Sequence, residues 1–287
     1  MNQLLAIVGP TATGKTALAV TLAKNQPSIL ISADSRQVYQ GMDIVTGKDQ
    51  PTGIKLYGID LASPDEPCSV SLWYHAVMPH IERAWGEGKL PIVVGGTGLY
   101  VKALTHGIET INVRPDPVLR ASLSSLTVIK LQEKLQSLSP GKLTSMNESD
   151  RANPRRLTRA IEVSLDRESH SEQAAASLMG APTCTLIGLR YYDDSNYRSA
   201  IKTRVLSRLA SGAVAETQAL VQKYGESIES LTAIGYRSLL RFIKCEISEE
   251  EMVNTWVRDE LAYAKRQLTW FKKYTVEWRF VDKPGNM

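Results

Sequence analysis

The sequence predicts an α/β fold: a P-loop NTPase-like parallel sheet flanked by helices, with a mostly helical insertion domain. Apolar, β-branched runs at residues 4–8, 29–32, 56–61 and 92–94 alternate with stretches long enough for crossover helices. That alternation is typical of a parallel sheet covered on both faces. The first run leads directly into a glycine-rich segment that ends in Gly-Lys-Thr. After residue 114 the strand pattern stops and helical periodicity replaces it.

We divide the chain into a core domain of residues 1–113 and 183–287 and a helical insertion domain of residues 114–182. Asp116 and Pro117 suit the N-cap and first turn of the first inserted helix. A strand at residues 185–189 is expected to return the chain to the sheet. Helices that end at glycines are then expected at residues 196–211 and 213–224. A capping box is expected to open a long helix from residue 248 onward, and a last strand is expected at residues 276–281.

Composition and charge exclude several functional classes. A formal net charge of +4 over 287 residues is mild, so a nucleic-acid partner must be argued from where basic residues cluster. The three cysteines show no C-x-x-C spacing and the four histidines are scattered, which argues against a disulfide framework or a zinc site. The first apolar run is too short for a signal peptide, and no run approaches membrane-spanning length. We therefore expect a cytoplasmic protein without a membrane partner.

The glycine-rich segment fits the phosphate-binding pattern G-x-x-x-x-G-K-[ST]. In such a loop the backbone N–H groups turn inward as an anion nest, and the following helix adds its positive N-terminal end. The lysine supplies a mobile cation, and the threonine hydroxyl is placed to bind a phosphate-bound Mg²⁺. We expect Mg²⁺ at Thr16 and phosphate contacts from Gly9, Pro10, Thr11, Ala12, Thr13, Gly14, Lys15 and Thr16.

Two further polar segments follow predicted strands and should therefore reach the same edge of the sheet. Asp34 comes after the second strand, where a carboxylate can act as a base or hold Mg²⁺ through water. The same residue could instead cap a following helix. Gly95, Gly96 and Thr97 come after the fourth strand. They allow close backbone approach to a ligand beside a hydroxyl, or they form a tight turn only.

An arginine-rich segment lies within the predicted insertion. Helical spacing puts Arg155 and Arg159 on one face beside Glu162, over a buried stripe that includes Leu157. A solvated charged face is one explanation of this pattern. Binding of a pyrophosphate or of a nucleic-acid backbone is the other.

The long final helix combines an apolar seam with aromatic and basic residues. The seam has the 4-3-4-3 spacing of a core-facing stripe, at residues 257, 261, 264, 268 and 271. Trp256, Tyr263 and Trp270 recur every seventh residue beside it and are expected to flank the core. Basic and aromatic side chains together also fit RNA contact through phosphates and stacked bases. Three basic residues share another face of the helix: Arg258, Lys265 and Lys272.

Taken together, these segments resemble the tRNA dimethylallyltransferase family, also called tRNA isopentenyltransferases. The resemblance rests on six blocks in the family's order over nearly the whole chain: GPTATGKT, ISADSRQVYQGMDI, PIVVGGTGLY, NPRRLTRAIEV, AIGYRS and AKRQLTWF. It implies transfer of the allylic group of dimethylallyl diphosphate to the N6 amine of an adenosine in tRNA, with release of diphosphate. That adenosine is the one immediately 3′ of the anticodon.

The resemblance also implies roles for individual residues. The family's catalytic aspartate falls on Asp34, its Gly-Gly-Thr threonine on Thr97, and the lysine of the phosphate loop on Lys15. Because the adenine amine is a poor nucleophile, Asp34 is expected to take its proton as the new bond forms. The insertion is expected to close over the anticodon arm. Contacts to tRNA are implied for Asp34, Ser35, Arg36, Gln37, Arg155, Arg156, Leu157, Thr158, Arg159, Lys265, Arg266 and Gln267.

One segment departs from the family pattern, and alternative functions stay open. The chain has Val45, Gly47 and Asp49 where the family often has glycine, alanine and proline, so contacts there are not carried over. An adenylate isopentenyltransferase acting on free AMP, ADP or ATP would share the chemistry. A P-loop small-molecule kinase is a further alternative, whereas a nucleotide switch would need a guanine-reading motif that is absent from the sequence. The working form is expected to be a monomer.

Overall fold

The computed structural model describes residues 2–48, 50–169 and 182–282, and the chain divides into two compact units. The first unit combines Met1–His106 with Ala181–Met287, and the second is Gly107–Gly180. The first unit is built on a sheet, whereas the second contains only helices within its described residues. No helix in the described ranges is both long and apolar enough to cross a membrane.

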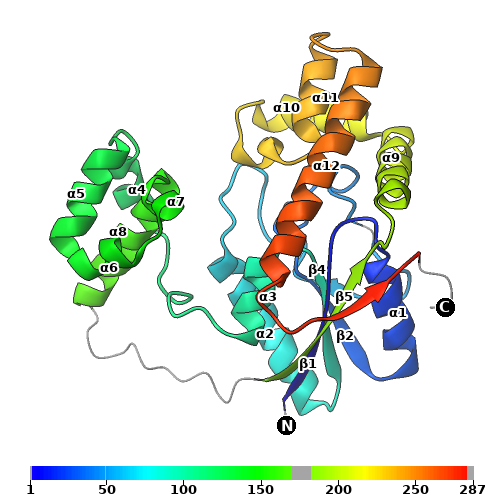
Figure 1. Ribbon diagram of the computed structural model, residues 1–287, viewed down its shortest axis with the longest axis horizontal. Helices are drawn as coiled ribbons and strands as arrows, with labels where there is room; N and C mark the ends of the chain where they lie inside the picture. Colours follow the sequence, from blue (N-terminus) through cyan, green and yellow to red (C-terminus); the bar gives the residue numbers. More distant parts are fainter. Residues whose placement is uncertain (1, 49, 170–181, 283–287) are drawn as a thin grey trace. The chain divides into compact units, whose positions relative to one another are not determined.

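A six-stranded sheet organises the first unit, and every neighbouring pair of its strands is parallel. The strand order is β3-β2-β4-β1-β5-β6, and Figure 1 labels β1, β2, β4 and β5. The predicted parallel sheet flanked by helices is thus confirmed. The strands are β1 (Gln3–Val8), β2 (Ser28–Ser32), β3 (Leu56–Tyr57), β4 (Leu90–Gly95), β5 (Thr183–Arg190) and β6 (Glu277–Phe280).

The predicted strand at residues 56–61 is wrong beyond Tyr57. Gly58 and Asp60 have φ angles of 83° and 55°, so the backbone turns away from the extended conformation. The Lys48 ammonium bonds one carboxylate oxygen of Asp60 at 2.5 Å and of Asp43 at 2.6 Å. The buried Lys48 ammonium therefore holds this loop through two ion pairs, where the apolar pattern alone indicated a longer strand.

The central strand β1 is buried on both faces of the sheet. Leu4, Ala6 and Val8 enter one apolar core, and Leu5 and Ile7 enter the core on the opposite face. This division follows from the two-residue period of a strand. The continuous apolar run before the glycine-rich segment is therefore the sequence of a strand with helices on both sides.

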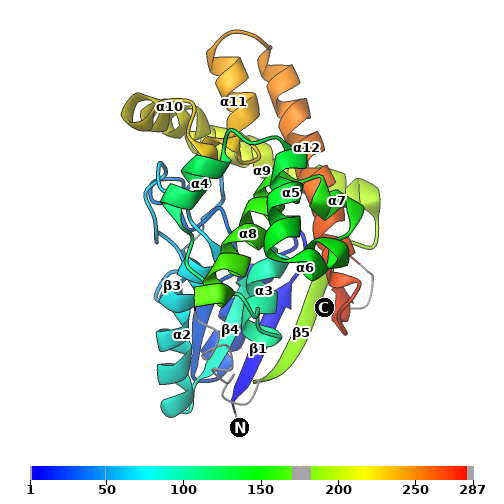
Figure 2. The same cartoon turned by 90° about the vertical axis from the view of Figure 1, so that its left-hand side faces the viewer.

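Helices cover both faces of the sheet and also extend beyond the carboxyl ends of its strands (Figures 1 and 2). The predicted capping box is confirmed, since Ser248 and Glu251 each bond the other's backbone N–H. The α-helices of this unit are α1 (Lys15–Asn25), α2 (Val70–Gly86), α3 (Gly98–Thr105), α9 (Asp194–Ala210), α10 (Ala213–Tyr224), α11 (Tyr236–Ile243) and α12 (Glu249–Phe271).

The second unit packs five described helices around a small apolar core (Figure 2). The predicted helix start is confirmed, because the Asp116 carboxylate accepts from the N–H groups of Val118 and Leu119. Leu135 and Leu157 are fully buried between the helices. The helices are α4 (Pro117–Leu123), α5 (Val128–Leu138), α6 (Pro140–Ser145), α7 (Glu148–Arg151) and α8 (Pro154–Ser169).

Candidate active site

A cavity of about 730 Å³ lies in the first unit, beyond the carboxyl ends of β2, β4 and β1. These three strands are neighbours in the sheet, so the segments that follow them lie in a row. Asp34 comes after β2, and the glycine-rich loop comes after β1. Gly95 is the last residue of β4, and Gly96 comes directly after it. The cavity is therefore at the sheet edge where parallel α/β folds bind ligands.

The glycine-rich loop has the backbone geometry of an anion nest. Gly9 and Gly14 have φ angles of 135° and 78°, which favour glycine, and Ala12 lies at 61°. A side chain at position 9 would also strike the Leu189 carbonyl of β5. The Thr13 hydroxyl donates to the Pro10 carbonyl at 2.9 Å and so braces the loop from within. The loop then enters α1 at Lys15, which directs the N-terminal end of that helix at the cavity.

Lys15 lines the cavity with its ammonium group bonded to the Pro10 carbonyl of its own loop. Burial lowers the pKa of this lysine to about 8, and the positive charge of Arg204 acts in the same direction. The carboxylates of Asp34 and Glu260 partly oppose that effect. A bound anion would favour the charged form further, because it would replace the lost solvation of the ammonium group.

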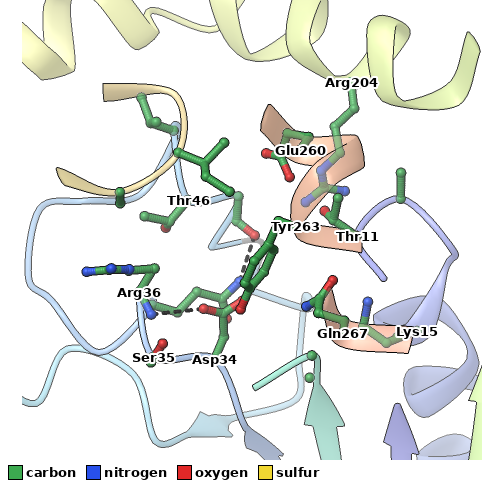
Figure 3. A pocket seen from close by; sticks show the side chains of 18 of the residues that line it. Thr11, Lys15, Asp34, Ser35, Arg36, Thr46, Arg204, Glu260, Tyr263 and Gln267 are labelled. Carbon is green, nitrogen blue, oxygen red and sulfur yellow. Dashed lines mark hydrogen bonds between the residues drawn. The ribbon is translucent and has the colours of Figure 1, made fainter. Parts of the chain in front are cut away.

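Asp34 forms the wall of the cavity opposite the glycine-rich loop (Figure 3). Its Oδ1 atom accepts from the backbone N–H of Arg36 at 2.9 Å, which closes a tight turn after β2. No α-helix begins in this segment, where residues 33–48 form turns and an isolated bridge. The alternative in which Asp34 caps a following helix is therefore wrong. One backbone hydrogen bond holds the Asp34 carboxylate, which faces the same cavity as the Lys15 ammonium.

Thr97 lies at the N-cap of α3, but its side chain makes no capping hydrogen bond to that helix. Its Oγ1 atom instead accepts from the backbone N–H of Ser35 at 3.0 Å. The Thr97 N–H donates to the Ala33 carbonyl at 3.1 Å. Thr97 therefore holds the turn that carries Asp34 from both sides.

The residues after Asp34 divide between the cavity and the support of its wall. Ser35 and Arg36 both line the cavity. Gln37 lines it as well, while its amide accepts from the Ser32 hydroxyl at 2.7 Å and donates to the Gly47 carbonyl at 3.0 Å. Gln37 thus joins the end of β2 to the next loop.

The loop that departs from the family pattern is anchored from outside by Glu216 of α10. Its carboxylate accepts from the backbone N–H groups of residues 43, 44 and 45 at 2.9, 2.6 and 3.1 Å. Val45 is buried against Gly235, where any side chain would meet it. Gly47 lies close to the guanidinium groups of Arg204 and Arg208, so a side chain there would strike both. Val45 and Gly47 therefore each fit the space that their neighbours leave. Asp49 lies outside the described residues.

Several polar side chains of helix α12 line the cavity, instead of all lying together on one solvent-facing surface. Tyr263, Arg266 and Gln267 line the cavity, whereas Lys265 is exposed and does not. Gln267 is only 6% exposed and packs against Gly96, where a side chain would strike its amide. The expectation that Tyr263 flanks the core is wrong, because the helix turns that position toward Asp34 (Figure 3).

Five charged residues that line the cavity were not predicted from the sequence: Arg204, Arg208, Arg237, Asp259 and Glu260. An Arg208 guanidinium nitrogen lies 3.0 Å from a Glu260 carboxylate oxygen, and both side chains are less than a tenth exposed. The buried stripe of α9 contains Tyr197, Ile201 and Val205, and Arg208 occupies its next position. A charged residue on an otherwise apolar stripe was the signal available in the sequence.

The predicted metal position, Thr16, stays a prediction, and the donors around it can be compared with what Mg²⁺ requires. Thr16 lies in the first turn of α1 and lines the cavity together with Asp34. Proteins usually hold Mg²⁺ with one or two oxygen ligands while the substrate's phosphates and water supply the rest. Within the described residues no cluster of three or more histidines, cysteines or acidic residues could hold a metal alone. The donor set therefore fits a cation that arrives with a phosphate compound.

In the second unit, the predicted arginine cluster on α8 is largely engaged with its own unit. Arg159 donates to Glu162 at 3.1 Å and to the carbonyls of Thr110 and Val113 at 2.9 and 2.8 Å. Arg156 is exposed and paired with Asp150. Arg155 is exposed, Thr158 is half-buried and Leu157 is fully buried. The predicted tRNA contacts of this helix stay predictions.

The model of the IPP transferase family matches residues 37–274, and that of the isopentenyl transferase family matches residues 2–60. A curated tRNA dimethylallyltransferase of Acetivibrio thermocellus is 37% identical over 284 residues, which cover 95% of this chain and 90% of that protein.

Solved structures give the same result. The tRNA isopentenylpyrophosphate transferase of Bacillus halodurans is 34% identical, with a TM-score of 0.70 over 98% of this chain and 90% of its own. A eukaryotic dimethylallyltransferase acting on tRNA, 23% identical, has the same fold, with a TM-score of 0.76 over 94% of this chain and 70% of its own. The chain therefore belongs to the IPP transferase family of prenyl-transferring enzymes.

Proposed function

We propose that this enzyme transfers the dimethylallyl group of dimethylallyl diphosphate to the N6 amine of the adenosine immediately 3′ of the anticodon in tRNA, releasing diphosphate. The observation that carries the proposal is the meeting of an anion nest with Lys15 and a carboxylate, Asp34, in one cavity. The nest is suited to bind the leaving diphosphate, and the carboxylate is suited to accept the proton that the amine releases. The names of its relatives, tRNA dimethylallyltransferases, favour this reaction over prenyl transfer to free nucleotides or phosphoryl transfer.

The donor binds with its diphosphate in the nest formed by residues 9–16. The backbone amides of the loop, the N-terminal end of α1 and the Lys15 ammonium face that position. Arg204 reaches the same part of the cavity from α9 (Figure 3), close enough to act on the pKa of Lys15. Because these groups are fixed before the reaction, they stabilise the charge that grows on the diphosphate oxygens as the bond to carbon breaks.

The transfer step balances with the groups in the cavity. The N6 nitrogen forms a bond to the first carbon of the allyl group, while the bond from that carbon to the diphosphate oxygen breaks and its electron pair leaves with diphosphate. Asp34 takes the proton that N6 releases. The carboxylate oxygen that is not bonded to the Arg36 N–H is the one available for this role. A magnesium ion held by the Thr16 hydroxyl and the diphosphate would neutralise part of the leaving-group charge.

The acceptor adenosine must leave its base stack to enter the cavity, as is general for enzymes that act on a base. The exposed Lys265 and the cavity-lining Arg266 supply positive charge for the RNA backbone. We assign the second unit, with Arg155 and Arg156 exposed on α8, to the anticodon arm. A monomer suffices for this scheme, because every group invoked belongs to one chain, and a tRNA substrate implies a cytoplasmic enzyme.

The test compares acceptors for the allyl group under identical conditions. Labelled dimethylallyl diphosphate is incubated with unmodified tRNA, AMP or ADP, and a parallel assay follows phosphoryl transfer from ATP. We expect label on tRNA alone. Label on AMP but not on tRNA would replace the proposal with an adenylate isopentenyltransferase, and phosphoryl transfer without prenyl transfer would replace it with a kinase.

The base is tested by Asp34→Asn, which preserves the shape of the side chain but removes its basicity. Turnover should fall at least about a hundred-fold, while binding of dimethylallyl diphosphate is retained. Equilibrium binding and single-turnover rates measure the two effects separately. Asp194→Asn, at an exposed position in the first turn of α9, is the matched control and should leave turnover unchanged. Near-normal turnover of Asp34→Asn would remove Asp34 as the base.

A further inference from the structure

The segment that follows β5 lies beside the glycine-rich loop that follows β1. The two strands pair in parallel, with Gly188 opposite Val8, so the residues after both of them emerge at the same edge of the sheet. Tyr191 comes directly after the last residue of β5, and Tyr197 lies in the first turn of α9. Both tyrosines are therefore placed to reach the loop.

Each of these tyrosines donates a hydrogen bond to a carbonyl of the loop. The Tyr191 hydroxyl donates to the Ala12 carbonyl, and the Tyr197 hydroxyl donates to the Thr11 carbonyl, at 3.3 Å in both bonds. The two rings pack against each other, with their centroids 5.2 Å apart. Neither tyrosine lines the cavity. The pair therefore holds the loop without occupying the space for a ligand.

The two bonds together fix the conformation of Ala12. The bonded carbonyls belong to the planar peptide units immediately before and after this residue. Because φ and ψ describe how these two planes are turned about the residue between them, holding both planes sets both angles. Ala12 has a φ of 61°, in the left-handed region that is disfavoured for a residue with a side chain. The tyrosines thus oppose relaxation of the loop at its strained position.

The same bonds set the direction of N–H groups in the nest. The carbonyl and the N–H of a trans peptide unit point in opposite directions. A bond to the Thr11 carbonyl therefore orients the N–H of Ala12, and a bond to the Ala12 carbonyl orients the N–H of Thr13. The Pro10 carbonyl accepts from the Thr13 hydroxyl at 2.9 Å and from the Lys15 ammonium. Three successive peptide units of the loop are thus held by their carbonyl oxygens.

Both hydroxyls keep the hydrogen that these bonds require. Burial raises the pKa of Tyr197, whose side chain is 8% exposed, and the negative charge of Glu260 acts in the same direction. Burial and the charge of Asp282 raise the pKa of Tyr191. Each phenol therefore stays protonated in the neutral range and acts as a donor to its carbonyl.

We propose that Tyr191 and Tyr197 are positioning residues, which hold the N–H groups of the glycine-rich loop in the orientation that binds diphosphate. The proposal deepens the proposed function, and its consequence for the rate of transfer rests on that function. Donors that are oriented in advance need no reorganisation as charge develops on the leaving group. The tyrosine pair should therefore assist departure of the diphosphate as well as its binding.

The test measures binding of inorganic diphosphate with Mg²⁺ to the full chain by calorimetric titration. Tyr191→Phe and Tyr197→Phe each remove one hydroxyl and keep the ring. We expect each to weaken diphosphate binding about 2- to 10-fold, the effect of one hydrogen bond, and the double variant to lose more than either. Affinity for tRNA should stay near that of wild type. Unaltered diphosphate affinity in the double variant would overturn the proposal, as would a wild-type chain that binds no diphosphate.

Two control variants separate positioning from a general loss of structure. Tyr192→Phe alters a neighbouring side chain that is 67% exposed, and Tyr39→Phe removes a buried hydroxyl that accepts from the Cys68 N–H at 3.4 Å. Both should bind diphosphate as wild type does. Equal weakening in Tyr39→Phe would reduce the effect to stability and overturn the positioning role.

The rate of prenyl transfer distinguishes this proposal from the proposed function. In single turnovers at saturating dimethylallyl diphosphate, transfer to tRNA should slow in both single variants and slow most in the double variant. If the wild-type chain transfers no prenyl group but the two substitutions still weaken diphosphate binding, the positioning role stands and the proposed function is refuted. If transfer occurs and the double variant binds diphosphate normally, the positioning role alone is refuted.

Discussion

At the scale of single residues, Lys15 is placed to bind an anion with its positive charge, yet its surroundings disfavour the charged form. Burial lowers its pKa from the ordinary value of 10.5 to about 8. Below pH 8 the folded chain must hold the charged form in a poorly solvated place, which costs stability. As the pH rises from 8 toward 10.5 this cost disappears, because the folded protein then binds fewer protons than the unfolded chain. A lysine that weakens the empty fold is suited to bind an anion tightly.

Donor binding should therefore take up a proton at alkaline pH. Between about pH 8 and 9 the free enzyme has a partly neutral Lys15, and the diphosphate restores its charge, so uptake should approach about one proton per donor. Calorimetric titration in two buffers of different ionisation enthalpy measures the uptake. In Lys15→Met it should vanish and the donor affinity should fall, whereas Lys24→Met, at an exposed site near the end of α1, should behave as wild type. Persistent uptake in Lys15→Met would assign the proton to another group.

The sequence predicted some of these residues and missed others for a physical reason. Lys15, Asp34 and Thr97 follow directly after strands, and the parallel sheet brings strand ends together whatever else the chain does. Arg204 and Tyr263 lie in the middle of helices. Which face of a helix meets the cavity depends on the rotation of that helix in the packed structure, and the apolar seam fixes this rotation only approximately.

At the scale of elements, a loop next to the cavity depends on a carboxylate from a distant helix. Glu216 of α10 accepts from three successive backbone N–H groups and from the Tyr236 hydroxyl at 2.7 Å. Four donors to one charged group form a strong anchor, because hydrogen bonds to ions exceed those between neutral groups. The loop after Met42 therefore needs α10 to keep its shape.

Glu216→Gln should loosen this loop and lower the free energy of unfolding by about 1–3 kcal/mol. The amide keeps one oxygen as an acceptor, but it introduces an NH₂ group among N–H donors. Urea unfolding measures the change in stability. Glu133→Gln on the exposed face of α5 is the matched control and should shift the midpoint little. An equally small shift for Glu216→Gln would mean that the loop is held by its apolar contacts instead.

Helix α8 is a second element at this scale, and it shows why a charged helix can mislead a sequence-based prediction. Arg159 and Glu162 share a face of α8 as predicted, yet the guanidinium donates to Thr110, Val113 and Glu162 within its own unit. Glu162 is 3% exposed and is also bonded by Arg120 at 2.6 and 2.9 Å. Helical periodicity gives the face of an arginine but not all of its partners, because Thr110 and Val113 lie 49 and 46 residues before Arg159.

At the scale of the whole molecule, a net charge of +4 is too small to bind RNA by itself, so the location of the charge decides. Lys265 and Arg266 are both exposed on α12, and Arg266 also lines the cavity. The double variant Lys265→Ala with Arg266→Ala should weaken tRNA binding and lower the slope of log affinity against log salt by roughly 1–2. Filter binding over a salt series measures both.

A matched double variant removes the same charge elsewhere. Lys24→Ala with Lys89→Ala alters the end of α1 and the residue before β4, at the amino ends of the strands rather than at the cavity. Its salt dependence and its affinity for tRNA should stay near those of wild type, and both double variants should bind dimethylallyl diphosphate normally. Equal losses in the two variants would indicate that net charge, rather than α12, governs the interaction.

The place of β5 in the sheet has a consequence for synthesis of the chain. β5 pairs with the central strand β1, yet it leaves the ribosome only after the whole second unit. The core of the first unit therefore stays incomplete on one side of β1 while Gly107–Gly180 emerges as a continuous segment with local helix–helix contacts. Because local contacts form faster than distant ones and domains fold as units during translation, the second unit should finish folding before the first.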